Sequence, residues 1–255
     1  MNMEVTVRPS MFVTFSSIVP IFFGLLFVAG ALVTGCGAPR PPVPAAGPNA
    51  LRFLALGDSY TIGERAEPAE RWPVQLAVAL RRDGINMGDP EIIARTGWTT
   101  GDLLAAMDQA KPAGPYDLVG LLIGVNNEFQ GRDEDEYRRE FGVLLDRSIA
   151  LAGGRAGRVV VLSIPDWGVT PFASYSGAIR PQVATAIDRF NAINKELTQK
   201  AGAAYVDITP ISRSHPEMIV SDGLHPNGAQ YALWVKQALP AVEKGLQTST
   251  AAAKP

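Results

Sequence analysis

Short apolar runs alternate with segments of helical periodicity from residue 51 to residue 245, and this alternation limits the folds open to the chain. The apolar runs, which predict buried strands, are Leu51–Leu56, Glu91–Ala94, Asp117–Ile123, Arg158–Ile164 and Ala204–Ile208. The segments with apolar residues three and four positions apart, which predict helices, are Trp72–Asp83, Thr100–Ala110, Glu134–Ala152, Gln182–Ala201 and Asn227–Gly245. Such alternation predicts an α/β fold, in which right-handed crossovers build a five-stranded parallel sheet into a three-layer α/β/α sandwich.

Composition excludes some classes of partner. The chain of 255 residues has a formal net charge of -2, and 47% of its residues are hydrophobic, which is ordinary for a globular protein. Its basic residues are scattered and do not form a cluster with aromatic residues. Because phosphate binding needs such a positive patch, we expect no nucleic-acid partner.

The N-terminal segment predicts export. Residues Met11–Val33 are almost entirely apolar, and Arg8 precedes them. The single cysteine of the chain, Cys36, follows this run directly after Thr34 and Gly35, and the pattern resembles the lipobox of bacterial lipoproteins. The resemblance implies a signal peptide over residues 1–35, a lipid on Cys36 and an extracytoplasmic protein that is tethered to the membrane by that lipid. The alternative is an uncleaved transmembrane anchor, because the apolar run is long enough to span a bilayer.

The remaining boundaries follow from local composition. Residues 36–50 are rich in proline, favour extended geometry and predict a tether. Residues 51–246 predict a single domain, and the small and polar residues 247–255 predict a disordered tail.

No cysteine follows Cys36, so no internal disulfide is expected. A domain of this size buries enough surface to fold without one.

Unusual loops follow the predicted strands. Gly57-Asp58-Ser59 follows the first strand, Gly97 lies after the second, Asn126 after the third, and a turn from Asp222 to His225 after the fifth. In open α/β sheets, ligands bind outside the carboxyl ends of the strands, so these loops should converge there.

The converging residues have the chemistry of a serine hydrolase. A serine is a weak nucleophile until a base removes its proton, and a carboxylate three residues before a histidine can orient that base. Ser59 is therefore the candidate nucleophile, His225 the candidate base and Asp222 the residue that orients it. The backbone N–H groups of Ser59 and Gly97 and the side-chain amide of Asn126 are candidate donors to an oxyanion.

These residues resemble the blocks of the SGNH hydrolase superfamily, also called GDSL esterases. Gly57-Asp58-Ser59 matches the first block, Gly97 the second, Gly124-Val125-Asn126 the third and Asp222-Gly223-Leu224-His225-Pro226 the last, and they occur in the family order. The resemblance implies a flavodoxin-like sheet and an esterase that needs no cofactor and no metal. Many members have Asp after the third-block Asn, whereas this chain has Asn127.

Some residues have a second interpretation. Asp222 and His225 could ligate a metal, but no further His or Cys is placed to complete the site, because His215 lies in a loop that is expected to face solvent. The loop aromatics Trp98, Trp167, Phe172 and Tyr175 could line a substrate pocket or anchor their loops on the sheet.

The function expected from the sequence is that of an extracytoplasmic serine esterase, which hydrolyses a small-molecule carboxylic ester through an acyl-enzyme. A thioesterase or lysophospholipase with the same residues is one alternative. A non-catalytic binding module on an esterase scaffold is another, since a fold does not fix a function. The sequence does not indicate the acyl chain, the alcohol or the oligomeric state.

Overall fold

Five parallel strands form one sheet in the computed structural model, which describes residues 45–251. The strands are β1 (Phe53–Gly57), β2 (Glu91–Ala94), β3 (Leu118–Leu122), β4 (Val159–Leu162) and β5 (Ala204–Val206). Their order across the sheet is β2-β1-β3-β4-β5, and every neighbouring pair is parallel. This is the flavodoxin-like order, so the predicted fold class is confirmed.

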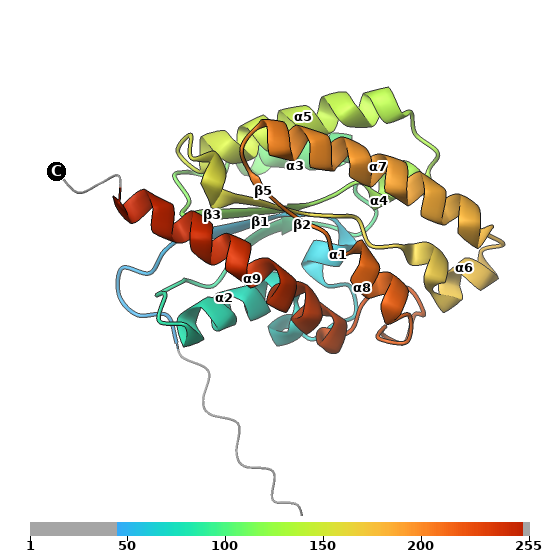
Figure 1. The fold of residues 1–255 in the computed structure, drawn as a ribbon, viewed down its shortest axis with the longest axis horizontal. Coiled ribbons are helices and arrows are strands. Elements are labelled where there is room, and N and C mark those ends of the chain that lie inside the picture. The colour runs from blue at the N-terminus through green and yellow to red at the C-terminus, as the bar shows by residue number, and fades with distance from the viewer. Residues whose placement is uncertain (1–44, 252–255) are drawn as a thin grey trace, which may run out of the picture. The chain divides into compact units, whose positions relative to one another are not determined.

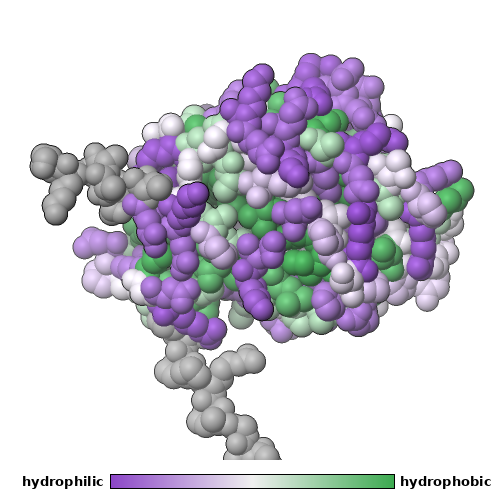
Figure 2. Space-filling model, in the orientation of Figure 1, coloured by the Kyte–Doolittle hydropathy of each residue, from purple (hydrophilic) through white to green (hydrophobic). Residues whose placement is uncertain are grey.

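Five long helices cover the two faces of the sheet (Figure 1). They are α2 (Trp72–Arg82), α3 (Thr100–Ala110), α5 (Glu134–Leu151), α7 (Arg180–Lys200) and α9 (Gly228–Ala251). Helices α3, α5 and α7 lie on one face, and α2 and α9 lie side by side on the other. Figure 2 shows that hydrophilic residues cover much of the visible surface, with hydrophobic patches between them. In α2, α3, α5 and α7 the buried residues recur three and four positions apart, so the apolar stripe of each helix is directed at the sheet.

Burial explains why the central strands appear in the sequence as continuous apolar runs. Every residue of β1, β3 and β4 is buried, because helices pack on both faces of these strands. The edge strands β2 and β5 are only partly buried. The strongest strand signals in the sequence therefore come from the centre of the sheet.

Short helices that the sequence analysis did not identify follow the strands at their carboxyl ends. They are α1 (Ser59–Ile62), α4 (Val125–Phe129), α6 (Pro171–Tyr175) and α8 (Thr209–Ser214). The single-turn 3-10 helices are η1 (Pro68–Glu70), η2 (Ala156–Arg158) and η3 (Trp167–Val169). Elements of three to six residues are too short to show a periodicity, so hydrophobic spacing cannot reveal them. Together, α1, α4, η3 and α6 supply residues to the site described below.

Two predicted boundaries need correction. The end of the proline-rich segment belongs to the domain, because the N–H of Gly47 donates to Asn86 Oδ1 (2.8 Å) and Asn86 Nδ2 donates to the carbonyl of Pro48 (3.0 Å). At the other end, α9 continues to Ala251, so residues 247–251 are helical and not a disordered tail. Leu246, directly before these residues, is buried in the core.

Within residues 45–251, no helix has the length and apolar character needed to cross a membrane. The predicted signal peptide, Cys36 and most of the predicted tether lie outside the described residues. Their assignment stays a prediction.

Candidate active site

The first strand ends in a tight turn that presents Ser59. Asp58 caps α1, and its Oδ1 accepts a hydrogen bond from the N–H of Tyr60 (2.9 Å). Gly57 permits a close approach of β1 to β3, because a Cβ atom at this position would lie 2.3 Å from the carbonyl oxygen of Leu122. Ser59 is the first residue of α1 and is 5% exposed. Its side chain is thus held at the carboxyl edge of the sheet.

The Asp222–His225 turn presents an oriented imidazole. His225 Nδ1 and Asp222 Oδ2 are 2.8 Å apart. The other carboxylate oxygen accepts hydrogen bonds from the N–H groups of Leu224 (2.8 Å) and His225 (3.0 Å). Burial opposes the charge of Asp222, but these hydrogen bonds hold the pKa of its carboxyl below the usual range. An ionised Asp222 fixes the imidazole so that Nε2 is left for the reaction.

Arg65 adds a cation beside this pair. Its Nε lies 3.7 Å from Asp222 Oδ2, and its side chain is largely exposed. An ion pair at this distance and exposure contributes little to stability, so the hydrogen bonds within the turn dominate the geometry of Asp222.

The candidate oxyanion donors come from three loops. No hydrogen bond within the described chain uses the N–H of Ser59 or of Gly97 as its donor, so both are available to a ligand. Gly97 has a φ of 85°, in the left-handed region that favours glycine. Asn126 Nδ2 donates one hydrogen bond to the carbonyl of Trp98 (2.9 Å), which fixes the plane of the amide. An amide nitrogen carries two hydrogens, so the second is left for an oxyanion.

Asn127 has a different position from its neighbour Asn126. Its side chain is fully buried, Oδ1 accepts from the N–H of Thr100 (3.0 Å), and Nδ2 donates to Thr100 Oγ1 (2.7 Å). Thr100 is the first residue of α3, and Thr99 before it forms a capping box with Asp102. Asn127 therefore joins α4 to the start of α3, directly after the loop that contains Gly97, and it does not line the cavity.

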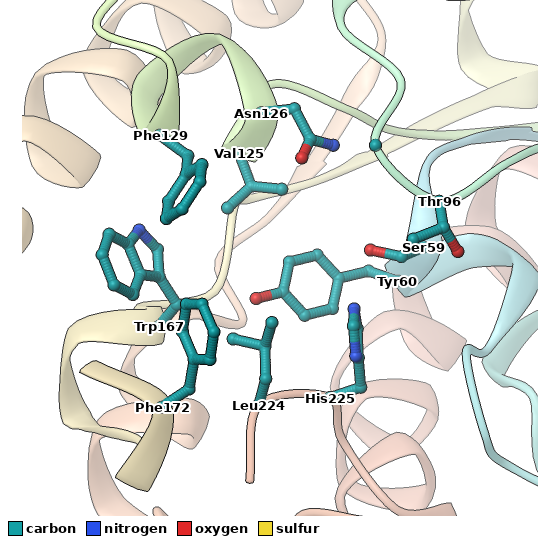
Figure 3. Close-up of a pocket in the computed structure, with 11 residues that line it drawn as sticks. Ser59, Tyr60, Thr96, Val125, Asn126, Phe129, Trp167, Phe172, Leu224 and His225 are labelled. Atoms are coloured by element: carbon teal, nitrogen blue, oxygen red, sulfur yellow. The ribbon is translucent and has the colours of Figure 1, made fainter. Parts of the chain in front are cut away.

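The predicted catalytic and oxyanion residues meet at one cavity of about 150 Å³ (Figure 3). Ser59, Gly97, Asn126 and His225 all line it. Asp222 lies behind His225, on the side away from the cavity. No direct hydrogen bond joins the described side chains of Ser59 and His225, a common situation in ligand-free sites, where catalytic hydrogen bonds tighten when substrate binds.

Aromatic rings form one wall of the cavity. Phe129, Trp167 and Phe172 pack against one another with ring centroids 5.2 to 6.2 Å apart. Trp167 Nε1 donates to Glu128 Oε2 (2.7 Å), which fixes the indole ring. Of the loop aromatics considered above, Trp167 and Phe172 line the cavity.

Trp98 and Tyr175 do not line it. The Trp98 side chain packs against the core beside β2 and α3, and Tyr175 is 85% exposed on α6.

His215 also lies apart from the cavity, with a partly exposed ring 3.5 Å from Glu217. Within residues 45–251, no cluster of three or more His, Cys, Asp or Glu side chains is arranged to hold a metal.

The sequence analysis missed several residues that line the cavity: Tyr60, Thr96, Val125, Phe129 and Leu224. Each of them is within three positions of a residue that was identified, so proximity in sequence was an available signal. Thr96 donates to the carboxylate of Glu64 and thereby ties the Gly97 loop to the segment after α1.

Asp58 is a buried carboxyl directly behind the nucleophile. Its Oδ2 has no hydrogen-bond partner in the part of the chain that the structure describes. Burial raises the pKa of Asp58 to about 7, although the N–H of Tyr60 partly opposes this. Two carboxyls of the same site are thus shifted in opposite directions, Asp58 upward and Asp222 downward.

Asp58→Asn is expected to remove a pH dependence of stability. Because the folded pKa lies above the unfolded one, the folded state binds the extra proton. The contribution of Asp58 is therefore fully present below pH about 4 and is lost as the pH rises to about 7, with a loss on the order of 4 kcal/mol. Asn cannot ionise but keeps the oxygen that accepts from Tyr60.

Urea unfolding of both proteins between pH 4.5 and 7.5 measures this effect. The wild-type free energy of unfolding should fall relative to that of Asp58→Asn as the pH rises. Asp89→Asn serves as the control, since Asp89 pairs with Arg81 at an exposed position. A difference between wild type and Asp58→Asn that stays constant with pH would contradict the shift.

Known proteins resemble the chain in sequence and fold. The sequence model of the GDSL-like Lipase/Acylhydrolase family matches residues 55–233. The GDSL lipase Rv0518 of Mycobacterium tuberculosis is 27% identical over 235 residues, which cover 88% of this chain and 95% of that protein. The structure of TesA superposes with a TM-score of 0.58 at 17% identity and covers 76% of this chain and 99% of that chain. The esterase EstA from Pseudoalteromonas sp. superposes with a TM-score of 0.56 at 17% identity and covers 76% and 98%.

The matched residues extend from β1 into α9 and include every candidate catalytic and oxyanion residue named above. The solved structures, all distant in sequence, share the fold. The chain therefore belongs to the GDSL-like lipase/acylhydrolase family and is a serine hydrolase that acts on ester bonds.

Proposed function

We propose that this chain is an extracytoplasmic serine esterase that hydrolyses a carboxylic ester through an acyl-enzyme. The observation that carries the proposal is the arrangement of Ser59 and His225 around one cavity, with Asp222 bonded to His225 Nδ1 at 2.8 Å. That arrangement leaves Nε2 of the same ring as the base for the Ser59 hydroxyl.

The reaction proceeds in two stages. Ser59 Oγ attacks the ester carbonyl carbon while its proton passes to His225 Nε2, and the tetrahedral species collapses as the same proton moves to the leaving alkoxide. Water then attacks the acyl-enzyme, His225 takes a proton from this water, and the acid leaves as the proton returns to Ser59. Asp222 stays ionised and stabilises the imidazolium in both stages.

Charge develops on the carbonyl oxygen in each stage. The free N–H groups of Ser59 and Gly97 and the second hydrogen of Asn126 Nδ2 are the donors that bind it. Because Trp98 already fixes the amide plane of Asn126, little reorganisation is needed when the oxyanion forms. This arrangement favours a catalytic function over the alternative of a binding module.

The apolar wall favours a carboxylic ester with a hydrocarbon portion. The cavity is small, and Val125, Phe129, Trp167, Phe172 and Leu224 supply most of its apolar lining. A thioesterase or lysophospholipase would use the same catalytic residues, and a solved phospholipase A1 from Streptomyces albidoflavus shares the fold at 20% identity with a TM-score of 0.56. A cavity of about 150 Å³ suits a short chain better than a long one.

Export and lipidation of Cys36 complete the proposal. The support for them is the apolar run 11–33 followed by Thr34-Gly35-Cys36 and a proline-rich segment. The lipid would hold the domain near the membrane, with the segment up to Gly47 as the connection.

Ser59 is expected to be the serine that a fluorophosphonate probe labels. Ser59→Ala should abolish labelling and lower the turnover of p-nitrophenyl acetate and butyrate by about 10⁴-fold or more, and His225→Ala should cost nearly as much. Asp222→Ala should cost less, because it orients the base and does not itself transfer a proton. Ser174→Ala, exposed on α6, is the control that keeps labelling. Unchanged turnover in Ser59→Ala would exclude the mechanism.

The variants Asn126→Ala and Asn127→Ala are expected to differ in their kinetic constants. Asn126→Ala should lower kcat by about 100- to 1000-fold with little change in KM, since it removes a donor that acts on the developing oxyanion. Asn127→Ala should cost less in kcat and instead lower the free energy of unfolding by about 1–3 kcal/mol, since Thr100 loses buried hydrogen bonds. Steady-state kinetics and urea unfolding of both variants measure this, and a larger kcat loss in Asn127→Ala would reverse the assignment.

Cys36→Ser is expected to prevent lipid attachment when the full chain is expressed in a bacterium that matures lipoproteins. Cys36→Ser should therefore block processing, so the variant should keep residues 1–35 and carry no lipid, whereas wild-type protein should begin at Cys36 with its lipid. Intact-mass analysis identifies the lipid and the first residue. Mature wild-type protein that begins beyond Cys36 and carries no lipid would exclude this part of the proposal.

A further inference from the structure

Tyr60 places a hydroxyl group inside the otherwise apolar part of the cavity. It is the second residue of α1, directly after Ser59, and is only 3% exposed. Its ring packs edge-on against His225 and Trp234, with centroid distances of 5.7 and 6.2 Å. Figure 3 shows its hydroxyl pointing away from Ser59, into the space between Val125, Leu224 and Trp167.

The hydroxyl lines the open cavity and is not one of the fully buried polar atoms without a partner, and none of the side-chain hydrogen bonds of the described residues uses it. Other polar atoms of the same wall are bonded within the protein. Trp167 Nε1 donates to Glu128, and Asn126 Nδ2 donates to Trp98. Tyrosine hydroxyls inside apolar surroundings usually bond a polar group. A hydroxyl that faces a ligand cavity and has no protein partner is available to a polar atom of a ligand.

The hydroxyl keeps a hydrogen that it can donate to a ligand. Burial raises the pKa of Tyr60 well above its ordinary value, and the nearby carboxyl of Asp58 raises it further, so the phenol stays protonated. The surrounding Val125, Phe172 and Leu224 side chains are apolar and offer no acceptor. The complementary group on a ligand is thus an oxygen that accepts a hydrogen bond.

We propose that Tyr60 is a specificity-determining residue that selects esters with an oxygen acceptor within the chain that fills the cavity. This inference rests on the proposed esterase function and narrows its substrate class from plain alkyl esters to oxygen-substituted ones, such as ethers or hydroxy- and keto-substituted chains. A site built to bond such an oxygen disfavours the analogue that lacks it, since a hydrocarbon chain that fills the cavity covers the hydroxyl and offers it no partner. The oxygen can belong to the acyl chain or to the alcohol, and the experiment separates these two sources.

Isosteric esters test the proposal. The acyl series consists of p-nitrophenyl hexanoate and its ether analogues propoxyacetate, 3-ethoxypropanoate and 4-methoxybutanoate. The alcohol series consists of hexyl acetate and its analogues 2-propoxyethyl, 3-ethoxypropyl and 4-methoxybutyl acetate. Each ether replaces one methylene, so chain length is constant within a series. The quantity measured is the ratio of kcat/KM for an ether to kcat/KM for its hydrocarbon parent.

Tyr60→Phe removes only the hydroxyl and keeps the ring that packs on His225 and Trp234. The ether-to-hydrocarbon ratio should fall by about 3- to 10-fold for at least one ether of one series, the effect of a neutral hydrogen bond. Comparing one ratio between proteins cancels the intrinsic reactivity of each ester. Tyr231→Phe is the matched control. It removes the hydroxyl of a buried tyrosine that does not line the cavity, and its ratios should equal those of wild type.

The outcomes are distinguishable. A fall confined to one series supports the proposal and identifies the acyl or the alcohol side. Equal ratios in wild type and Tyr60→Phe for every ether, with the esters still hydrolysed, overturn the inference and leave the esterase function standing; Tyr60 then bonds only water. If wild type hydrolyses none of the esters, the proposed function fails and the inference fails with it.

Discussion

The parallel pairing of β1 with β3 is the constraint on which the site depends. Gly57 is paired with Leu122 at the ends of these strands, so the Ser59 turn and the Asn126 turn leave the sheet at the same level. A side chain at position 57 would collide with the carbonyl of Leu122 and separate the two strands. Ser59 and Asn126, the candidate nucleophile and the candidate side-chain donor to an oxyanion, are therefore placed relative to each other by main-chain hydrogen bonds between β1 and β3.

The environment gives two aspartates of this site different protonation behaviour. Asp222 receives hydrogen bonds from an imidazole and two N–H groups, and its pKa is lowered. Asp58 is fully buried with one unpaired oxygen, and its pKa is raised. The carboxyl that works with the base stays ionised, while the one that shapes the nucleophile turn loses its charge readily. The difference arises mainly from burial, which is complete around Asp58 and only partial around Asp222, where the hydrogen bonds outweigh it.

Much of the fold could be predicted from the sequence, because the central strands are buried on both faces and the long helices are amphipathic. Both properties leave a regular pattern, and the predicted Thr100–Ala110 helix agrees with α3 at both ends. The short helices α1 and α4 have no such pattern, since they are held by capping and by contacts between loops. Likewise, the positions of Ser59 and His225 were predictable from their motifs, but the wall of Phe129 and Trp167 depends on how η3 and α4 meet, which no local signal specifies. The hydroxyl of Tyr60 could be assigned a direction only once the cavity was known.

The hydrogen bond from Asn126 to the carbonyl of Trp98 links two of the candidate oxyanion donors mechanically. Trp98 is the residue after Gly97, so the Gly97 N–H and the Asn126 amide are attached to the same short loop. A ligand or substitution that displaces this loop moves both donors together and cannot weaken one while sparing the other. The oxyanion site should consequently assemble or come apart as a single unit, with Asn127 and Thr100 as its fixed support on the side of α3.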